Sequence, residues 1–503
     1  MVGSLLCAAL LLQAGPPAHG VRPTSLLIRD VMVVRGNATP AFGPTDVLLR
    51  GDRIESIGKF DLAQSAKSAE PPAAVIDGHG KYLLPGFVNL HGHVQEERGG
   101  LAIENEYQFS LWLACGMTTV RNVGADFPLE HLLELKERSR RGELAAPNLL
   151  AYETLSPDRP DKLREQVRAA KKKGADGLKL FTMDRDQLEA IADEAKKAEL
   201  PITIHMGVEE TNVLDCCRLG FTSIEHWYGI PDAALKGVQS FPPEFSYSNE
   251  VDRFRYAGRL WRETDPDKLE SVLQTMVDSH LVWDPTLAIY EASRDLTRAQ
   301  NQPWFADYLH PGLAKFFEPN LANHGSYFIG WSSSDEAYWK ENYRIWMKAV
   351  KRFAELGGTV TCGEDAGFIY EMYGFGYLRE LELHEEAGFA PLEVIEQATL
   401  NGAKTLGLDS EIGRVRAGHR ADLILVDGNP LSNLRLLYPT GADIAVAGKP
   451  VHAGGIEWTI KDGIPYHGPT LLARVREIVR QARSHPAPAN VGGGGGGSCC
   501  AGG

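Results

Sequence analysis

The sequence is poor in cysteine and has no hydrophobic run long enough to cross a membrane. It holds only seven cysteines in 503 residues, and none has the CxxC spacing typical of metal sites. We expect the four in the body of the chain to be buried free thiols rather than a disulfide framework: Cys115, Cys216, Cys217 and Cys362. Because the apolar run at residues 5–12 is too short to span a bilayer, we expect no stable membrane anchor.

Positive charge is also scarce. The chain has 52 Lys and Arg against 66 Asp and Glu, which gives a formal net charge of -14. Proteins that bind nucleic acids need a positive field to attract the phosphates. The balance therefore argues against a nucleic-acid partner.

The first twenty residues predict a secretory signal peptide. An apolar run is followed by a Pro/Gly break and by the small-x-small pattern at residues 18–20. No Lys or Arg precedes the run, so the alternative is an apolar N-terminus on a cytoplasmic protein. We expect residues 1–20 to be a signal peptide and the protein to be periplasmic or secreted.

Strand-like segments occur near both ends of the chain, rich in β-branched and apolar residues and bounded by Gly, Asp and Asn. They predict a composite β-sandwich with an N-terminal part at 21–84 and a C-terminal part at 411–467. A helix is expected at 468–485. The Gly-rich tail, 486–503, cannot bury enough apolar surface to become ordered, and we expect it to be disordered.

The middle of the chain, residues 85–410, alternates eight short apolar runs with charged, amphipathic helix patterns. Eight strands alternating with helices predict an α/β fold, a (β/α)8 TIM barrel. The runs are 86–93, 118–124, 147–153, 176–181, 201–205, 222–226, 281–287 and 358–365.

The connections at 227–280 and 288–357 are too long to be structureless and must contain extra elements. Seven of the nine tryptophans lie between residues 227 and 346. Either these aromatic residues cover the barrel mouth and a bulky, partly apolar substrate pocket, or they pack inserted helices onto the barrel. We expect packing to account for most of them.

Four histidines and an aspartate fall at the ends of the predicted strands. His91 and His93 are two residues apart, so both side chains lie on one face of the first strand. His205, His226 and Asp365 end the fifth, sixth and eighth runs. Barrel enzymes assemble their sites at these strand ends. Imidazole and carboxylate donors suit zinc, with iron, cobalt or manganese as alternatives.

A lysine interrupts the fourth run. Lys179 lies between two leucines in GADGLKLF, residues 174–181. It either extends its ammonium group to solvent from the strand end or loses its proton in a dry site. The second alternative would make it a ligand precursor.

Together these motifs resemble the amidohydrolase superfamily, over roughly residues 25–475. The resemblance implies a TIM-barrel hydrolase with a β-module. The segments that carry it are LLPGFVNLHGH (83–93), GMTTVRNVG (116–124), SIEH (223–226), CGEDAG (362–367) and IGRVRAGHRADLILVDGNPL (412–431).

Lys179 matches the lysine that carries a carbamate in the imidazolonepropionase-like and prolidase-like (Xaa-Pro dipeptidase-like) branch. The resemblance then implies two divalent metal ions, with zinc as the expected metal. It assigns the ligands as follows: His91, His93 and Asp365 for the first ion, His205 and His226 for the second, and N6-carboxylated Lys179 for both.

The resemblance also implies a mechanism in which a metal-bridging hydroxide attacks the scissile carbonyl and Asp365 carries its proton to the leaving amine. Glu364 departs from the family pattern, where a small residue precedes the aspartate. We prefer Asp365 because it directly precedes Ala366 and Gly367, as in the family. Tyr228 either donates a hydrogen bond to the substrate oxygen or packs against the inserted segment.

The sequence therefore predicts a binuclear amidohydrolase that cleaves a C–N bond in a small-molecule amide, such as a dipeptide or an N-acylated amino acid. One alternative is hydrolysis of a cyclic amide, a lactone or a phosphoester at the same centre. Another is a catalytically inactive, amidohydrolase-like binding protein, which the complete set of expected ligands disfavours. A homo-oligomer is compatible with the sequence.

Overall fold

The computed structural model describes residues 15–60, 71–207, 210–243, 245, 250–320, 325–326 and 328–484. Residues 1–14 of the predicted signal peptide and the whole predicted Gly-rich tail lie outside the described residues, so both assignments stay predictions. None of the helices in the described part of the chain is long and apolar enough to cross a membrane.

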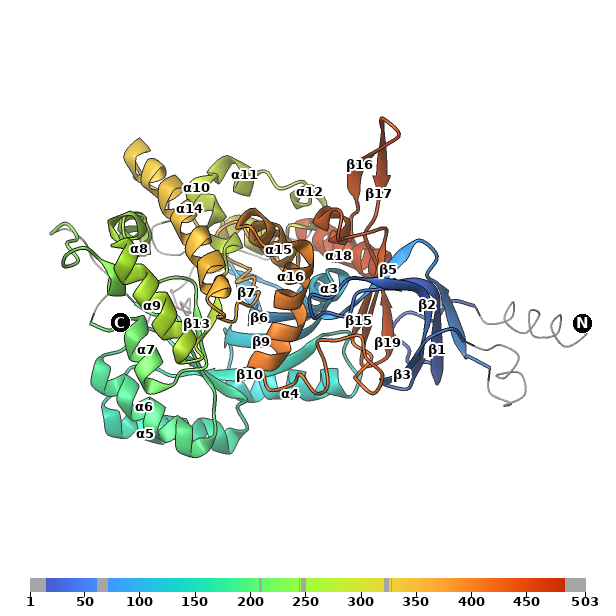
Figure 1. The fold of residues 1–503 in the computed structure, drawn as a ribbon, viewed down its shortest axis with the longest axis horizontal. Coiled ribbons are helices and arrows are strands. Elements are labelled where there is room, and N and C mark those ends of the chain that lie inside the picture. The colour runs from blue at the N-terminus through green and yellow to red at the C-terminus, as the bar shows by residue number, and fades with distance from the viewer. Residues whose placement is uncertain are drawn as a thin grey trace, which may run out of the picture.

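Strands from both ends of the chain join in one sheet, as predicted (Figure 1). β5 pairs with β1 on one side and with β15 on the other, so it connects the N-terminal strands to the C-terminal ones. The sheet order is β19-β18-β15-β5-β1-β2-β3, with β4 beside β1. The strands are β1 (Ser25–Val33), β2 (Phe42–Arg50), β3 (Arg53–Ile57), β4 (Ala74–Asp77), β5 (Lys81–Pro85), β15 (Leu423–Asp427), β18 (Ile456–Lys461) and β19 (Ile464–His467).

The predicted β-sandwich module is built from strands that are continuous in one sheet, which branches at β1. The first half of β1 pairs with β4 and its last residues pair with β5. Apolar residues from β1 to β5, β15 and β18 form a core separate from that of the barrel. The branch therefore lets one sheet enclose a core of its own.

Seven parallel strands form most of the barrel, each paired with the next in chain order. They are β6 (Phe87–Val94), β9 (Met117–Ala125), β10 (Asn148–Thr154), β11 (Gly177–Leu180), β12 (Ile202–Ile204), β13 (Ser223–Glu225) and β14 (Val282–Asp284). Burial on both faces explains why these strands are near-continuous apolar runs.

The eighth predicted strand, 358–365, is not a regular strand. It makes a single bridge, between Trp283 and Val360. Its backbone nevertheless bonds to both neighbours: Thr361 donates to the Trp283 carbonyl (3.0 Å), and Leu90 donates to the Cys362 carbonyl (3.1 Å). The barrel is therefore closed, and the prediction of a (β/α)8 barrel holds with an irregular eighth segment.

Amphipathic helices cover the outside of the barrel. In α5 the buried residues are Leu163, Val167 and Ala170, spaced by one helical turn, while the opposite face is charged. The covering helices are α3 (Asn105–Ala114), α4 (Leu129–Arg140), α5 (Pro160–Lys173), α6 (Arg185–Ala198), α7 (Val213–Leu219), α9 (Pro266–Asp278), α14 (Ser333–Glu355), α15 (Phe375–Glu386) and α16 (Pro391–Glu396), followed by η4 (Gln397–Asn401), a π-helical turn, and α17 (Gly402–Thr405). The predicted C-terminal helix is α18 (Gly468–Ser484), which packs on α3.

The long connections contain short helices. After β13 come η1 (Asp232–Ala234), α8 (Glu250–Ala257) and η2 (Trp261–Glu263); after β14 come η3 (Ala288–Tyr290), α10 (Glu291–Arg294), α11 (Leu296–Gln300), α12 (Phe305–Tyr308) and α13 (Pro311–Phe316). Trp227 is fully buried and lies 5.9 Å from Trp339 and 6.2 Å from Trp346 between ring centroids. Packing of the insertions therefore accounts for these tryptophans.

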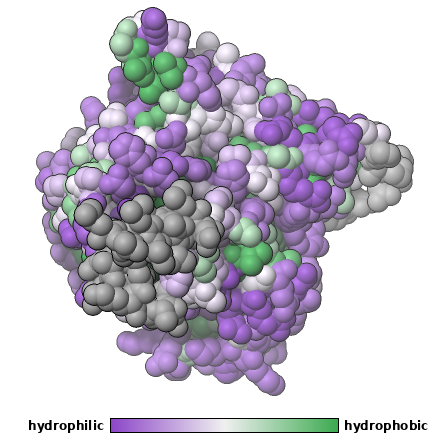
Figure 2. Space-filling view, turned by 90° about the vertical axis from the view of Figure 1, so that its right-hand side faces the viewer, coloured by the Kyte–Doolittle hydropathy of each residue, from purple (hydrophilic) through white to green (hydrophobic). Residues whose placement is uncertain are grey.

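Two small hairpins and one turn complete the fold: β7 (Glu97–Arg98) with β8 (Leu101–Ala102), β16 (Ala442–Val446) with β17 (Lys449–Ala453), and the turn η5 (Leu434–Leu437). The β16–β17 hairpin projects from the body of the molecule (Figure 1). Figure 2 shows hydrophobic side chains on the projecting tip, where Val446 and Val451 are exposed.

The turn between β18 and β19 packs tightly on the turn between β2 and β3. Gly463 has a φ of 74°, and a Cβ atom there would overlap the carbonyl oxygen of Gly51. Gly407 has a similar φ of 68° but open space around it. We expect Gly407→Ala to cost only the left-handed backbone term, about 1–2 kcal/mol. Gly463→Ala should cost a further ~1–3 kcal/mol because of the overlap.

Thermal and urea unfolding of the two variants measure this difference. Equal losses of stability would mean that the contact between the two turns does not contribute.

Candidate metal centre

All six predicted ligands line one pocket at the C-terminal ends of the barrel strands. The space between its lining atoms, including the part open to solvent, is about 390 Å³. The six are His91, His93, Lys179, His205, His226 and Asp365. The structure thus brings together residues from five different strands or strand ends, as sites in this fold require.

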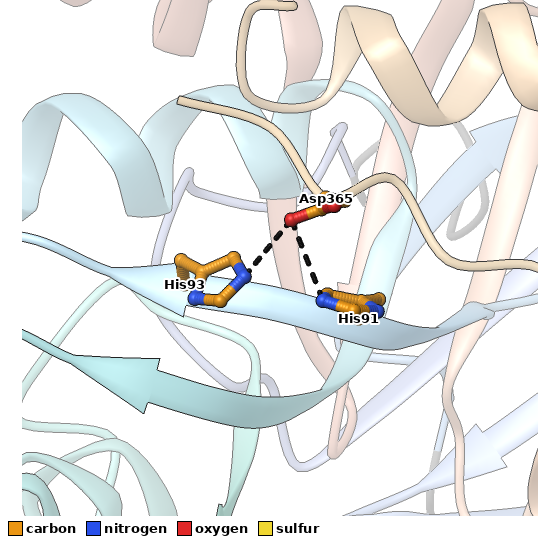
Figure 3. Close-up of side chains that lie close together, drawn as sticks. All are labelled: His91, His93 and Asp365. Carbon is orange, nitrogen blue, oxygen red and sulfur yellow. Dashed lines mark hydrogen bonds and ion pairs between the residues drawn. The ribbon is translucent and has the colours of Figure 1, made fainter. Parts of the chain in front are cut away.

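His91, His93 and Asp365 form the tightest group (Figure 3). Both histidines come from β6, and Asp365 reaches between them from the irregular eighth segment. One carboxylate oxygen, Oδ1, lies 3.0 Å from His93 Nε2 and 3.4 Å from His91 Nε2. These three atoms therefore converge on one point.

Backbone and hydroxyl acceptors fix which nitrogen of two histidines faces the pocket. His93 Nδ1 donates to the Gly124 carbonyl (3.1 Å). The Thr286 hydroxyl donates its own proton to the Pro285 carbonyl (2.8 Å). It therefore accepts a hydrogen bond from His226 Nδ1 (2.5 Å). Each imidazole then keeps its Nε2 lone pair for the pocket, as a metal ligand must.

Four residues in or next to the pocket have left-handed backbone conformations: His226 (φ 60°), Thr286 (φ 48°), Asp365 (φ 49°) and Ile369 (φ 44°). Such conformations are unfavourable for residues other than glycine and tend to occur at functional sites. Here they turn the side chains inward at the strand ends. His226 Nε2 comes within 3.7 Å of Asp365 Oδ2, and the His205 and His226 rings are 4.4 Å apart between centroids.

The local electrostatics favour the protonation states that metal ligands need. Burial lowers the pKa of His91 well below its ordinary value, and the positive charge of Lys179 lowers it further. Burial acts to raise the pKa of Asp365, but the contact with His93 Nε2 and nearby positive charge, including that of Lys179, outweigh it, so the pKa lies below its ordinary value. Neutral imidazoles and an ionised carboxylate are the ligand forms.

These donors fit a divalent cation. The ligand atoms of His91, His93 and Asp365 all lie within 4.8 Å of one another in a buried setting. His91 and His226 form a second such group with Glu225. Nitrogen and carboxylate oxygen donors in this proportion are the set that zinc prefers.

Glu225 is the residue that the sequence analysis missed. It is fully buried and forms an ion pair with Lys179 Nζ. It also accepts a hydrogen bond from Thr203 Oγ1 (3.0 Å) and lies 3.5 Å from Arg121 Nη2. Strand alternation would point Glu225 and His226 to opposite sides, but the left-handed turn at His226 brings both inside. Its position next to a ligand histidine was the available signal.

Glu364 points away from the ligands, so only Asp365 of this pair faces the pocket. The Glu364 carboxylate accepts hydrogen bonds from Trp112 Nε1 and from the backbone N–H of Gly374 (2.7 Å). Burial raises the pKa of Glu364 to about 7. It belongs to the packing between β6, α3 and the eighth segment.

Tyr228 is buried beside the centre. Its ring stacks on His205, with 5.2 Å between ring centroids, and on Trp227. The described residues that line the pocket do not include it. The proposed contact with the substrate oxygen stays a prediction, while the packing contact is present.

The loop after β14 is held by a buried carboxylate. Glu380 on α15 accepts backbone hydrogen bonds from Leu287 (2.9 Å) and Ala288 (2.6 Å). Thr286, the partner of His226, directly precedes these two residues. Glu380 therefore fixes the backbone that orients one ligand.

The chain belongs to the amidohydrolase family. The family model for amidohydrolases matches residues 348–477. A 5-methylthioadenosine/S-adenosylhomocysteine deaminase from Moorella thermoacetica is 60% identical over 437 residues, 80% of this chain and 85% of that protein. A 5'-deoxyadenosine deaminase from Methanobrevibacter smithii is 22% identical over 483 residues, 87% of this chain and 92% of that protein.

Solved structures share the fold. A Xaa-Pro dipeptidase with bound methionine has a TM-score of 0.60 at 18% identity, covering 88% of this chain and 100% of that one. A putative prolidase from Bifidobacterium longum has a TM-score of 0.61 at 19% identity, covering 90% and 100%. The protein is thus a TIM-barrel member of the amidohydrolase superfamily, a class of hydrolases.

Replacing Thr286 tests the orientation of His226. Thr286→Val keeps the shape but removes the acceptor for Nδ1–H, and loss of such a partner costs about 10- to 100-fold in metal affinity or activity. Thr286→Ser keeps the acceptor and is the matched control. Zinc titration of the metal-free protein measures the effect. Equal affinities for the valine and serine variants would contradict this role.

Proposed function

We propose that the protein is a binuclear metal-dependent hydrolase that cleaves an amide bond in a dipeptide or an N-acylated amino acid. The observation that carries this proposal is the position of Lys179. Its side chain is 1% exposed and lines the pocket together with the five other candidate ligands. Its ion pair with Glu225 holds the amine at the pocket, where a bridging ligand would have to lie.

Two ions would divide the ligands as follows: His91, His93 and Asp365 for one, His205 and His226 for the other, and carboxylated Lys179 for both. Carboxylation joins the neutral amine nitrogen to carbon dioxide and releases one proton. It converts a cation, which would repel the ions, into an anionic oxygen ligand. When bound, the ions supply Lewis acidity and lower the pKa of water.

The side chains supply the remaining steps. Asp365 lies at the centre of the ligand group and is ionised, so it is suited to take a proton from the attacking water and give it to the leaving amine. Gly124 and Thr286 hold two imidazoles in their ligand tautomers. The likeness to structures described as prolidases and a Xaa-Pro dipeptidase supports an amide between amino acids as the substrate.

The names of the sequence relatives favour a second candidate, hydrolytic deamination of an adenosine-type nucleoside. That reaction also breaks a C–N bond, and the imidazole and carboxylate ligands would serve it equally. A carboxylated Lys179 would weigh against it, because a single ion held by histidines and an aspartate needs no bridging ligand.

A two-part substrate panel separates the candidates. The zinc-loaded protein is incubated with Xaa-Pro and other dipeptides, with N-acetyl amino acids, and with 5'-deoxyadenosine and methylthioadenosine. We expect new amino acids from the first two groups and no ammonia from the nucleosides. Ammonia release without amide cleavage would establish the second candidate instead.

Lys179→Met tests the bridging ligand, because it keeps the stem of the side chain but removes the nitrogen. We expect the paired ions to be lost and activity to fall to about one-hundredth or less, since even the partners of ligands are worth 10- to 100-fold. Added bicarbonate should restore neither.

Lys461→Met is the matched control. Lys461 is equally buried, but it donates to the Ser139 carbonyl (2.7 Å) in the β-module interface. This variant should lose stability and keep both ions. Two retained ions in Lys179→Met would rule out the carbamate bridge.

A further inference from the structure

The wall of the metal-site pocket is built from apolar and aromatic side chains on four separate loops or inserted elements. They are Phe181, Phe254, Ile289, Tyr290, Phe368 and Ile369. The other described residues that line the pocket are the six candidate ligands. Every charged or imidazole side chain among these lining residues is thus a candidate metal ligand.

The apolar wall flanks the candidate ligands on both sides. Phe368 meets His93 edge-on, with 5.3 Å between ring centroids, next to the ligands of the first ion. On the other side, Phe181 lies 5.8 Å from the His205 ring, and Lys179 Nζ sits 5.0 Å from the Phe181 centroid. If these ligands held ions and the scissile carbonyl reached them, the flanking groups of the substrate would lie against mainly apolar side chains.

Most side chains of the wall are almost fully excluded from solvent. Phe254, Ile289 and Tyr290 are each 2% exposed, and the Phe254 and Tyr290 rings are 5.7 Å apart between centroids. A polar group buried there without a partner loses its hydrogen bonds to water and regains none.

We propose that the substrate carries apolar side chains on both sides of the scissile amide, with branched aliphatic or aromatic residues preferred over polar residues of equal size. This inference rests on the proposed amide hydrolysis and narrows it to a substrate class. It also disfavours sugar-bearing substrates, because Tyr290 carries the only hydroxyl among the described wall residues and could not serve the several hydroxyls of a ribose.

Leucine and asparagine have similar shapes, so they provide a test of polarity alone. The zinc-loaded protein is assayed with Leu-Leu, Asn-Leu, Leu-Asn and Asn-Asn, each free and N-acetylated. We expect kcat/KM to fall about 10- to 100-fold for each asparagine, the usual range for an unpaired buried polar group. Equal rates across the set would overturn the inference while leaving amide hydrolysis established. No hydrolysis of any member would instead count against the proposed function.

Variants of Ile289 test whether the apolar wall causes the preference for apolar substrates. Ile289→Val and Ile289→Thr give side chains of the same shape that differ in one hydroxyl. The threonine variant should reduce the preference for leucine over asparagine by at least about threefold relative to the valine variant, since the hydroxyl gives the substrate amide a partner.

Val451→Thr, on the exposed β16–β17 hairpin, should leave the preference unchanged. Thermal unfolding and zinc content confirm that the variants are folded and loaded. Equal preferences in the two Ile289 variants would show that this wall does not select the substrate.

Discussion

The candidate site depends on hydrogen bonds that close the barrel between its first strand and its eighth segment. Leu90 donates to the Cys362 carbonyl (3.1 Å), and Asp365 donates to the His91 carbonyl (2.9 Å). These bonds join segments from distant parts of the sequence. Because His91 and His93 are alternate residues of β6, the same closure places both imidazoles below the Asp365 carboxylate. The tightest ligand group is therefore a product of backbone pairing.

Below the ligands, the barrel interior carries charges that must balance one another. Arg121 donates to the Leu90 carbonyl (2.6 Å) and Ser223 Oγ (2.9 Å), and its guanidinium also approaches Glu225 and Asp284. Burial raises the pKa of Asp284 to about 7. Buried charges are stable only when they are paired, so Arg121 stabilises these two buried carboxylates. The proposed carbamate would remove the positive charge of Lys179, and two divalent ions would restore the balance.

The barrel and the composite β-module could be predicted because they follow local periodicity, which also places four histidines and Asp365 at strand ends. Lys179 joined the candidate ligands only through the resemblance to the amidohydrolase superfamily. Apolar runs alternate with helix patterns, and a two-residue spacing places His91 and His93 on one strand face. Glu225 could not be predicted in this way, because its inward direction depends on the left-handed backbone at His226. The role of Thr286 could not be predicted for a similar reason. It lies beyond β14 in a loop whose shape depends on contacts with α15, which no local pattern encodes.

Where the regular backbone pairing of the strands ends, buried polar side chains hold the backbone in place instead. Glu380 caps the backbone of the loop after β14, and His384 donates from Nε2 to Glu380 (3.0 Å) and from Nδ1 to Gln397 (2.7 Å). Cys362, in the eighth segment, lies 3.9 Å from the same imidazole. One polar cluster on α15 thus supports both irregular segments. The ladder fixes the two ligands on β6, while this cluster fixes the loop that orients His226.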